Sequence, residues 1–219
     1  MSEFAAGPAG RIERVRALMV ERGYDAIVVR DEANLRWLTG VKGVFDYTFE
    51  FPHAAFITAD QCLFHTDSRY LNSFEENTPA GSPWVYDMDE GTIPGWVAGK
   101  IAANKCRVCA VEDDMQINFY QGIQRGLEDR SVACMLPLMH DDIRKMRAIK
   151  DAEEIELMRH AQSITDAAFQ HMLGFIKPGM TEKQVRNELE NFMFANGADS
   201  LAFGSIVASG PNTANPHAV

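Results

Sequence analysis

The chain has 219 residues, of which 46% are hydrophobic and 24% charged, a composition typical of globular proteins. Its formal net charge of −10 disfavours nucleic acid or an anionic membrane as the main partner, because both require clustered cations. The N-terminal stretch MSEFAAGPAG lacks the features of a secretory signal, and no stretch approaches the ~18 apolar residues of a membrane span. We therefore expect a cytoplasmic protein with no nucleic-acid or membrane partner.

The first part of the chain alternates helical and strand patterns. IERVRALMVERGYD has apolar residues at the spacing of one helix face, and DAIVV has the pattern of a buried strand. The short apolar runs HAAFIT and QCLFHT predict a β-hairpin. RVCAVE, INFYQGIQRGLED and SVACMLPL then predict a strand, a helix and a strand. This alternation predicts an α/β domain over residues 1–140, with a mainly parallel or mixed sheet covered by helices.

The pattern becomes almost entirely helical over residues 141–219. Asp151 with Glu154, and Thr181 with Gln184, have the spacing of capping boxes and predict the starts of two amphipathic helices. FGSIVAS then predicts a strand with no visible partner. Because a lone strand leaves its backbone groups unpaired, we expect this region to be the beginning of a domain. The alternative is that the strand joins the sheet of the first domain.

Two of the four cysteines, Cys106 and Cys109, form a C-x-x-C pair. Such a pair can bind metal or carry out redox chemistry. On a strand, however, residues three apart point to opposite faces, and no second pair supplies the remaining ligands. We interpret both as buried strand cysteines whose sulfurs diverge, and a functional C-x-x-C is the alternative.

Several other side chains have structural interpretations. Trp37, Tyr70 and Phe74 are expected in the core of the first domain. Arg69 is expected to form an internal salt bridge, with Asp67 as one candidate partner. Two histidines of the predicted long helix, His160 and His171, are expected at the surface or half-buried, because no third ligand of the right type follows them.

Ordered motifs in the second half resemble a known family. RKMRAIKDAEEIELMRHA, FIKPGMTEKQVRNELENFM and GADSLAFGSIVASGPNTANPHA resemble the opening of the pita-bread metallopeptidases, which include Xaa-Pro aminopeptidases, prolidases and creatinase. YDAIVVRDEANLRWLTG and HTDSRYL are similar to the creatinase-type N-terminal domain of that family. The resemblance implies an α/β domain with a mixed sheet and flanking helices over residues 1–140. A connecting helix and the truncated helical opening of a pita-bread α+β domain follow over residues 141–219.

The resemblance also implies a function. Family members hydrolyse the peptide bond preceding proline with two divalent cations (manganese, zinc or cobalt), which activate a bridging hydroxide and stabilise the developing oxyanion. In the family, two aspartates, one histidine and two glutamates hold these ions, and all five follow the motif matched here by PHA. The sequence carries no residue beyond Val219. We therefore expect no metal ligand, no bound cofactor and no activity in this chain alone.

His217 is the one catalytic residue that the resemblance carries over. The family histidine at this position binds no metal and donates a hydrogen bond to the substrate or the tetrahedral intermediate. Histidine suits this role because it can donate in either protonation state. The N-terminal domains of the family reach over a partner subunit's active site, so we expect a homodimer that acts on peptides. His53, His65 and the aromatic stretch GVFDYTFEFPH are candidates for that border or for the contact with the dimer partner.

Three alternatives remain open at this point. One is a creatinase-like or lyase reaction on the same scaffold. Another is a non-catalytic member of the fold that acts as a binding module. The last is a free-standing α/β binding domain over residues 1–140 with a helical tail.

Overall fold

The computed structural model describes residues 7–42, 52–88 and 91–218. Contacts divide the chain into two compact units, Met1–Ile149 and Lys150–Val219. The described helices of the first unit are α1 (Gly7–Arg22), α2 (Glu32–Thr39), α3 (Leu71–Asn77), α4 (Ile93–Ala103), α5 (Ile117–Asp129) and α6 (Asp142–Ala148). Its described strands are β1 (Ala26–Val29), β2 (Ala54–Thr58), β3 (Cys62–His65), β4 (Val85–Asp87) and β5 (Cys109–Val111).

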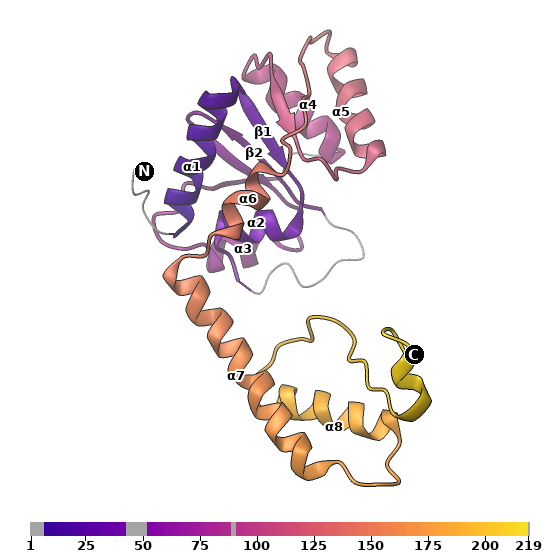
Figure 1. Cartoon of the computed structure of the whole chain (residues 1–219). Helices are drawn as coiled ribbons and strands as arrows, with labels where there is room; N and C mark the ends of the chain where they lie inside the picture. The colour runs from indigo at the N-terminus through magenta and orange to yellow at the C-terminus, as the bar shows by residue number, and fades with distance from the viewer. Residues whose placement is uncertain (1–6, 43–51, 89–90, 219) are drawn as a thin grey trace. The chain divides into compact units, whose positions relative to one another are not determined.

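These strands form one sheet in the order β4-β3-β2-β1-β5, in which the strands labelled β1 and β2 in Figure 1 are neighbours. The β1–β2 and β2–β3 pairs are antiparallel, whereas β1–β5 and β3–β4 are parallel. The sheet is therefore mixed, as the sequence predicts. The predicted hairpin is also present, with Ala54 opposite His65 and Ile57 opposite Cys62. Thr58 closes its turn, because its Oγ1 donates to Asp60 Oδ1 at 2.8 Å.

Helices cover both faces of the sheet, because side chains alternate along each strand. On β1, Ile27 and Val29 belong to a core shared with α1, α2, α3 and α6. Ala26 and Val28 belong to a second core shared with α4 and α5, and those two helices pack against each other (Figure 1). The first core also contains Trp37 and Phe74, with Tyr70 packed against it, which confirms the predicted core positions.

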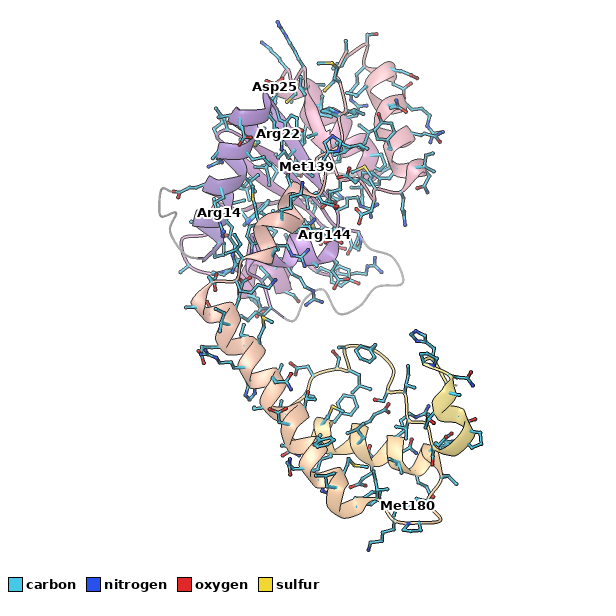
Figure 2. The ribbon with its side chains drawn as sticks, in the orientation of Figure 1. Arg14, Arg22, Asp25, Met139, Arg144 and Met180 are labelled. Carbon is cyan, nitrogen blue, oxygen red and sulfur yellow. The ribbon has the colours of Figure 1, made fainter. Side chains whose placement is uncertain are left out.

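Two side chains fix the ends of β1 and α2. Asp25, which precedes β1 (Figure 2), accepts hydrogen bonds from the backbone N–H groups of Arg107 (2.7 Å) and Val108 (3.0 Å). Asp31 caps α2 by accepting from Asn34 N at 2.7 Å. At the other end, Gly40 has a φ of 68° and donates its N–H back to the helix. This left-handed conformation favours glycine.

The predicted strand SVACMLPL does not form a continuous ladder. The structure has only isolated parallel bridges there, Val108 with Met135 and Val111 with Leu138. Pro137 accepts from Val111 N at 2.9 Å through its carbonyl, but proline has no N–H to donate in return. The segment therefore stays an irregular edge beside β5.

The second unit contains α7 (Ala152–Phe175), α8 (Glu182–Ala195) and the 3-10 helix η1 (Gly210–Ala214). Both predicted capping boxes are present, at Asp151 with Glu154 and at Thr181 with Gln184. The predicted strand FGSIVAS is absent: residues 203–209 have no strand conformation. No described segment of this unit offers a strand to pair with, and an unpaired strand leaves its backbone groups unsatisfied.

Helix α6 packs within the first unit. Ile143 lies in the first core, and Arg147 Nη1 donates to Asn34 Oδ1 on α2 at 2.8 Å. The compact units thus divide after Ile149, and the domain boundary expected after residue 140 stays a prediction. None of the helices in the described ranges has the length and hydropathy of a membrane span.

Candidate functional site

His217 lies in the turn that follows η1 in the second unit, and its side chain is exposed. Ala218 N donates to Asn215 O at 3.2 Å, which closes this turn. The ring makes no hydrogen bond or ion pair with any residue that the structure describes. Within the described residues the ring is thus available to a ligand, and no neighbour fixes its orientation.

Glu182 anchors the segment that leads to His217. As the first residue of α8, its carboxylate accepts from Ser209 N at 2.6 Å and from Asn212 Nδ2 at 3.1 Å. A carboxylate at a helix N-terminus is also stabilised by the helix dipole. One side chain therefore ties η1 to the start of α8. Local sequence patterns do not reveal this role, because the partners of Glu182 lie 27 and 30 residues away along the chain.

A histidine–carboxylate pair joins α7 to α8. His171 Nε2 lies 2.6 Å from Glu188 Oε1, and the ring stacks on Phe192 with centroids 4.4 Å apart. His171 is half-buried and His160 is exposed, as predicted. We interpret the pair as a contact that fixes the packing of the two helices.

His53 and His65 are packed inside the first unit, with exposed fractions of 1% and 6%. The His53 ring centroid lies 5.1 Å from those of both Tyr70 and Phe74. Burial among these rings lowers the pKa of His53 to about 4, so it is neutral at physiological pH. The predicted active-site border stays a prediction, and residues 43–51 of the aromatic stretch lie outside the described residues.

The Asp67 carboxylate binds Arg69, as expected for that ion pair. Arg69 Nη2 donates to Asp67 Oδ2 at 2.7 Å, and this hydrogen bond is the largest cause of the lowered pKa of Asp67. The pair orders the turn that precedes α3.

The predicted divergence of the C-x-x-C sulfurs is wrong. Cys106 precedes β5 instead of lying on it, so Cys106 and Cys109 both face the second core. Both are buried, as predicted, and burial raises the pKa of the Cys106 thiol to about 11 and that of Cys109 well above its ordinary value. Protonated, buried thiols are poor nucleophiles and poor metal ligands. A structural role in the core follows.

The described residues do not fit a dinuclear metal centre. Across residues 7–42, 52–88 and 91–218, no three His, Cys, Asp or Glu side chains are grouped so that they could hold an ion. Two adjacent cations need several carboxylates converging from different segments. No catalytic step through a metal is therefore assigned to these residues.

Comparison with known proteins identifies the family to which the chain belongs. Residues 11–149 match the Creatinase/Prolidase N-terminal domain, and residues 156–219 match Metallopeptidase family M24. A creatinase-type N-terminal domain followed by the start of an M24 domain is the organisation that the sequence motifs imply. The chain belongs to the creatinase/prolidase-type M24 metallopeptidase family.

Individual relatives extend this similarity along most of the chain. It is 31% identical over 216 residues to the uncharacterized peptidase YqhT of Bacillus subtilis, covering 95% of this chain and 56% of the relative. The solved Xaa-Pro dipeptidase from Bacillus anthracis shares 31% identity with a TM-score of 0.81, covering 95% and 55%. The X-Pro aminopeptidase from Thermotoga maritima shares 26% identity with a TM-score of 0.77, covering 95% and 55%. The chain thus spans about half the length of these relatives.

Proposed function

We propose that this chain serves in the metal-dependent hydrolysis of peptide bonds that precede proline. It would supply the creatinase-type N-terminal domain and the opening of the catalytic domain of an Xaa-Pro aminopeptidase or dipeptidase. One observation carries this proposal: 95% of the chain matches the Bacillus anthracis Xaa-Pro dipeptidase at 31% identity and a TM-score of 0.81. The match of residues 156–219 to Metallopeptidase family M24 also supports this proposed function.

Within this proposal His217 binds the substrate. Its exposed ring would donate a hydrogen bond to the peptide carbonyl oxygen and to the oxyanion that replaces it. Glu182 is a positioning residue, because it holds the segment that leads to His217. The bound cations (manganese, zinc or cobalt) would activate water, and their ligands lie outside the described residues. The chain alone is therefore inactive in this proposal.

The proposed partners are a peptide substrate and a second copy of the chain. The homodimer rests on the resemblance to the family alone. Phe169, Leu173 and Ile176 on the second unit are 60%, 64% and 52% exposed, and in this proposal the rest of the catalytic domain covers them. A net charge of −10 argues against nucleic acid and anionic membranes, and a cytoplasmic location stays a prediction.

A chimera tests the function. Residues 1–219 are joined to the part of the Bacillus anthracis Xaa-Pro dipeptidase that the alignment does not cover, and the product is loaded with Mn²⁺. We expect it to bind metal and to cleave alanyl-proline. His217→Ala should lower kcat about 10²-fold, the usual cost of removing one oxyanion donor. His160→Ala, which removes another exposed histidine, is the matched control and should leave kcat unchanged.

Circular dichroism and metal content separate failure to fold from failure of the proposal. A folded, metal-loaded chimera that leaves alanyl-proline intact contradicts the proposed reaction. Creatine is assayed in parallel, since its hydrolysis would assign the creatinase-like alternative. A His217→Ala variant with unchanged kcat would remove the role of that histidine.

A further inference from the structure

Residues 133–139, which join α5 to α6 (Figure 1), form one edge of the sheet in the first unit. This segment, the outer edge, runs parallel to β5 through the bridges Val108–Met135 and Val111–Leu138. Because β5 is the last strand in the order β4-β3-β2-β1-β5, no described strand lies on the other side of the outer edge. A sheet edge presents a row of backbone donors and acceptors, and proteins usually protect it from pairing with another chain.

The backbone of the outer edge uses only every second residue to pair with β5. Met135 forms two backbone hydrogen bonds toward the β5 side, at 2.8 and 2.9 Å, and Met139 N forms another at 2.9 Å. In an extended chain the backbone groups of successive residues point in opposite directions. Those of Cys134, Leu136 and Leu138 therefore face away from β5, and they make no hydrogen bond to any described residue.

Pro137 does not protect the outer edge. Proline commonly guards an edge strand because it has no N–H to offer to another chain. Here the Pro137 carbonyl accepts from Val111 N at 2.9 Å, so the missing donor lies on the inner side. The stretch CMLPLM over residues 134–139 carries no charge, and Met135 and Leu138 are 65% and 43% exposed. The outer edge is thus apolar, uncharged and open to pairing.

The outward groups have the spacing needed to pair with a second copy of the same edge. In an antiparallel ladder, every second pair of opposite residues exchanges two backbone hydrogen bonds. If Leu136 lies opposite the partner's Leu136, then Cys134 lies opposite the partner's Leu138, and Leu138 opposite the partner's Cys134. One two-fold axis therefore satisfies all three outward positions at once, which is the geometry of a symmetric dimer.

A cavity beside the outer edge offers space for a side chain of the partner. It has a volume of about 390 Å³ and lies between α5 and the outer edge, with Leu127 and Cys134 among its lining residues. Cys134 and Leu136 pack against the second core, so the even-numbered side chains face the side of the sheet that α5 covers. A two-fold axis perpendicular to the sheet places the partner's Leu138 on this side, next to the cavity. Pairing thus buries an apolar side chain that is half-exposed in a single copy.

The charges beside the two ends of the outer edge have opposite signs. Arg107 lies at the first end, and its exposed side chain forms no ion pair with any residue in the described ranges. Three aspartates lie at the other end, Asp113, Asp114 and Asp141, and Arg144 pairs with the last two. Antiparallel pairing brings Arg107 of each copy toward the aspartates of the other. This attraction offsets part of the repulsion expected between two chains that each carry a net charge of −10.

We propose that the outer edge binds the same edge of a second copy of this chain, so that the two sheets continue into each other across a two-fold axis. The backbone groups of the three outward positions form the ladder, and the cavity beside α5 receives the partner's Leu138. This inference rests on the homodimer of the proposed function and assigns a surface to it. It is independent of the proposed hydrolysis, because the pairing involves no metal and no substrate.

Amide hydrogen exchange of the 219-residue chain, resolved by NMR at a series of protein concentrations, tests the proposal. Sedimentation velocity gives the fraction of dimer in each sample. We expect the amides of Cys134, Leu136 and Leu138 to exchange at least about tenfold more slowly in the dimer than in the monomer. The amides of Met135 and Met139, which bond toward β5, should be protected in both. A dimer in which the three outward amides exchange fast would overturn the proposal, as would a chain that stays monomeric at about 1 mM.

A charge placed on the outer edge should weaken the dimer. Leu138→Lys changes an exposed side chain whose backbone forms no hydrogen bond within the described residues, and the dimer Kd should rise at least about tenfold. Met135→Lys is a second variant of the same edge with the same expectation. The matched control Val85→Lys alters a residue that is 60% exposed on β4, at the opposite edge of the sheet, and should leave the Kd unchanged.

Circular dichroism verifies that each of these variants is folded. An unchanged Kd in a folded edge variant would overturn the proposal, and so would an equal loss of dimer in Val85→Lys. Neither measurement depends on peptide cleavage. Failure of this inference is therefore distinguishable from failure of the proposed reaction.

Discussion

Glu112 and Asn34 join two loops that are far apart in the sequence. Asn34 Nδ2 donates to Glu112 Oε1 at 2.7 Å across 78 positions of the chain. This contact lies between the end of β5 and the first turn of α2, and the same carboxylate also accepts two backbone N–H groups. One buried acid thus ties the end of β5 to the loop that follows its parallel neighbour β1.

Replacement of Glu112 by glutamine should destabilise the first unit. The amide retains one acceptor oxygen but places an NH₂ group against backbone N–H donors. We expect the free energy of unfolding to fall by about 1–3 kcal/mol, measured by urea denaturation with circular dichroism. Asp114→Asn, at an exposed position on the same loop, is the control and should change it little. Equal midpoints for both variants would contradict this role of Glu112.

Acidification should destabilise the first unit through His53. Its pKa falls from 6.5 to about 4 in the folded chain, so the unfolded chain takes up a proton first as the pH falls. Stability is therefore lost as the pH falls from about 6.5 to about 4, by roughly 3 kcal/mol for this residue. Denaturant unfolding at a series of pH values measures the loss.

The variant His53→Phe provides the comparison for this pH dependence. Phenylalanine keeps an aromatic ring beside those of Phe64, Tyr70 and Phe74 and cannot be protonated. The difference in stability between the variant and the parent should therefore grow as the pH falls below about 6.5. A difference that stays constant with pH would argue that His53 is not the titrating group.

The four thiols should differ in reactivity. Cys62, Cys106 and Cys109 are buried and Cys134 is half-buried. Burial raises the pKa of Cys62 and Cys106 to about 11, so little thiolate is present at neutral pH. A maleimide reagent should label Cys134 first, with the other three reacting only after unfolding. Peptide mapping by mass spectrometry identifies the labelled site, and rapid labelling of Cys106 would contradict the buried assignment.

Removal of the Glu182 carboxylate should loosen the segment before His217. In Glu182→Ala, Ser209 N and Asn212 Nδ2 lose their acceptor. Amide hydrogen exchange over residues 205–214 should then accelerate about fivefold or more, which corresponds to the loss of one net hydrogen bond. The control Glu190→Ala changes another acid of α8. If both variants exchange alike, Glu182 does not hold this segment.

Sequence patterns correctly predicted the helices and the hairpin whose stabilising contacts lie between residues close together in the chain. The helix expected from INFYQGIQRGLED is α5, Ile117–Asp129, and both capping boxes begin helices where the spacing places them. The hairpin also follows from two apolar runs joined by a short turn. In each case the contacts that stabilise the element join residues close together in the chain, so the local sequence is sufficient to predict it.

Interactions between distant segments were not predictable in this way. FGSIVAS has strand propensity but no described partner in its unit, and Pro137 interrupts the ladder beside β5. The face to which Cys106 points depends on the residue at which β5 begins, and the apolar pattern of RVCAVE did not define that residue. The roles of Glu112 and Glu182 depend on donors far away in the chain, and only the position of Glu112 directly after a buried strand gave a signal.

In our proposal, the described residues of this member of a metallopeptidase family do not by themselves form its metal centre. The most direct test is the metal content of the purified 219-residue chain after equilibration with Mn²⁺ and removal of free ions, measured by mass spectrometry. We predict no stoichiometric manganese, because the described residues contain no suitable group of ligands. Retention of two tightly bound ions per chain would contradict the account.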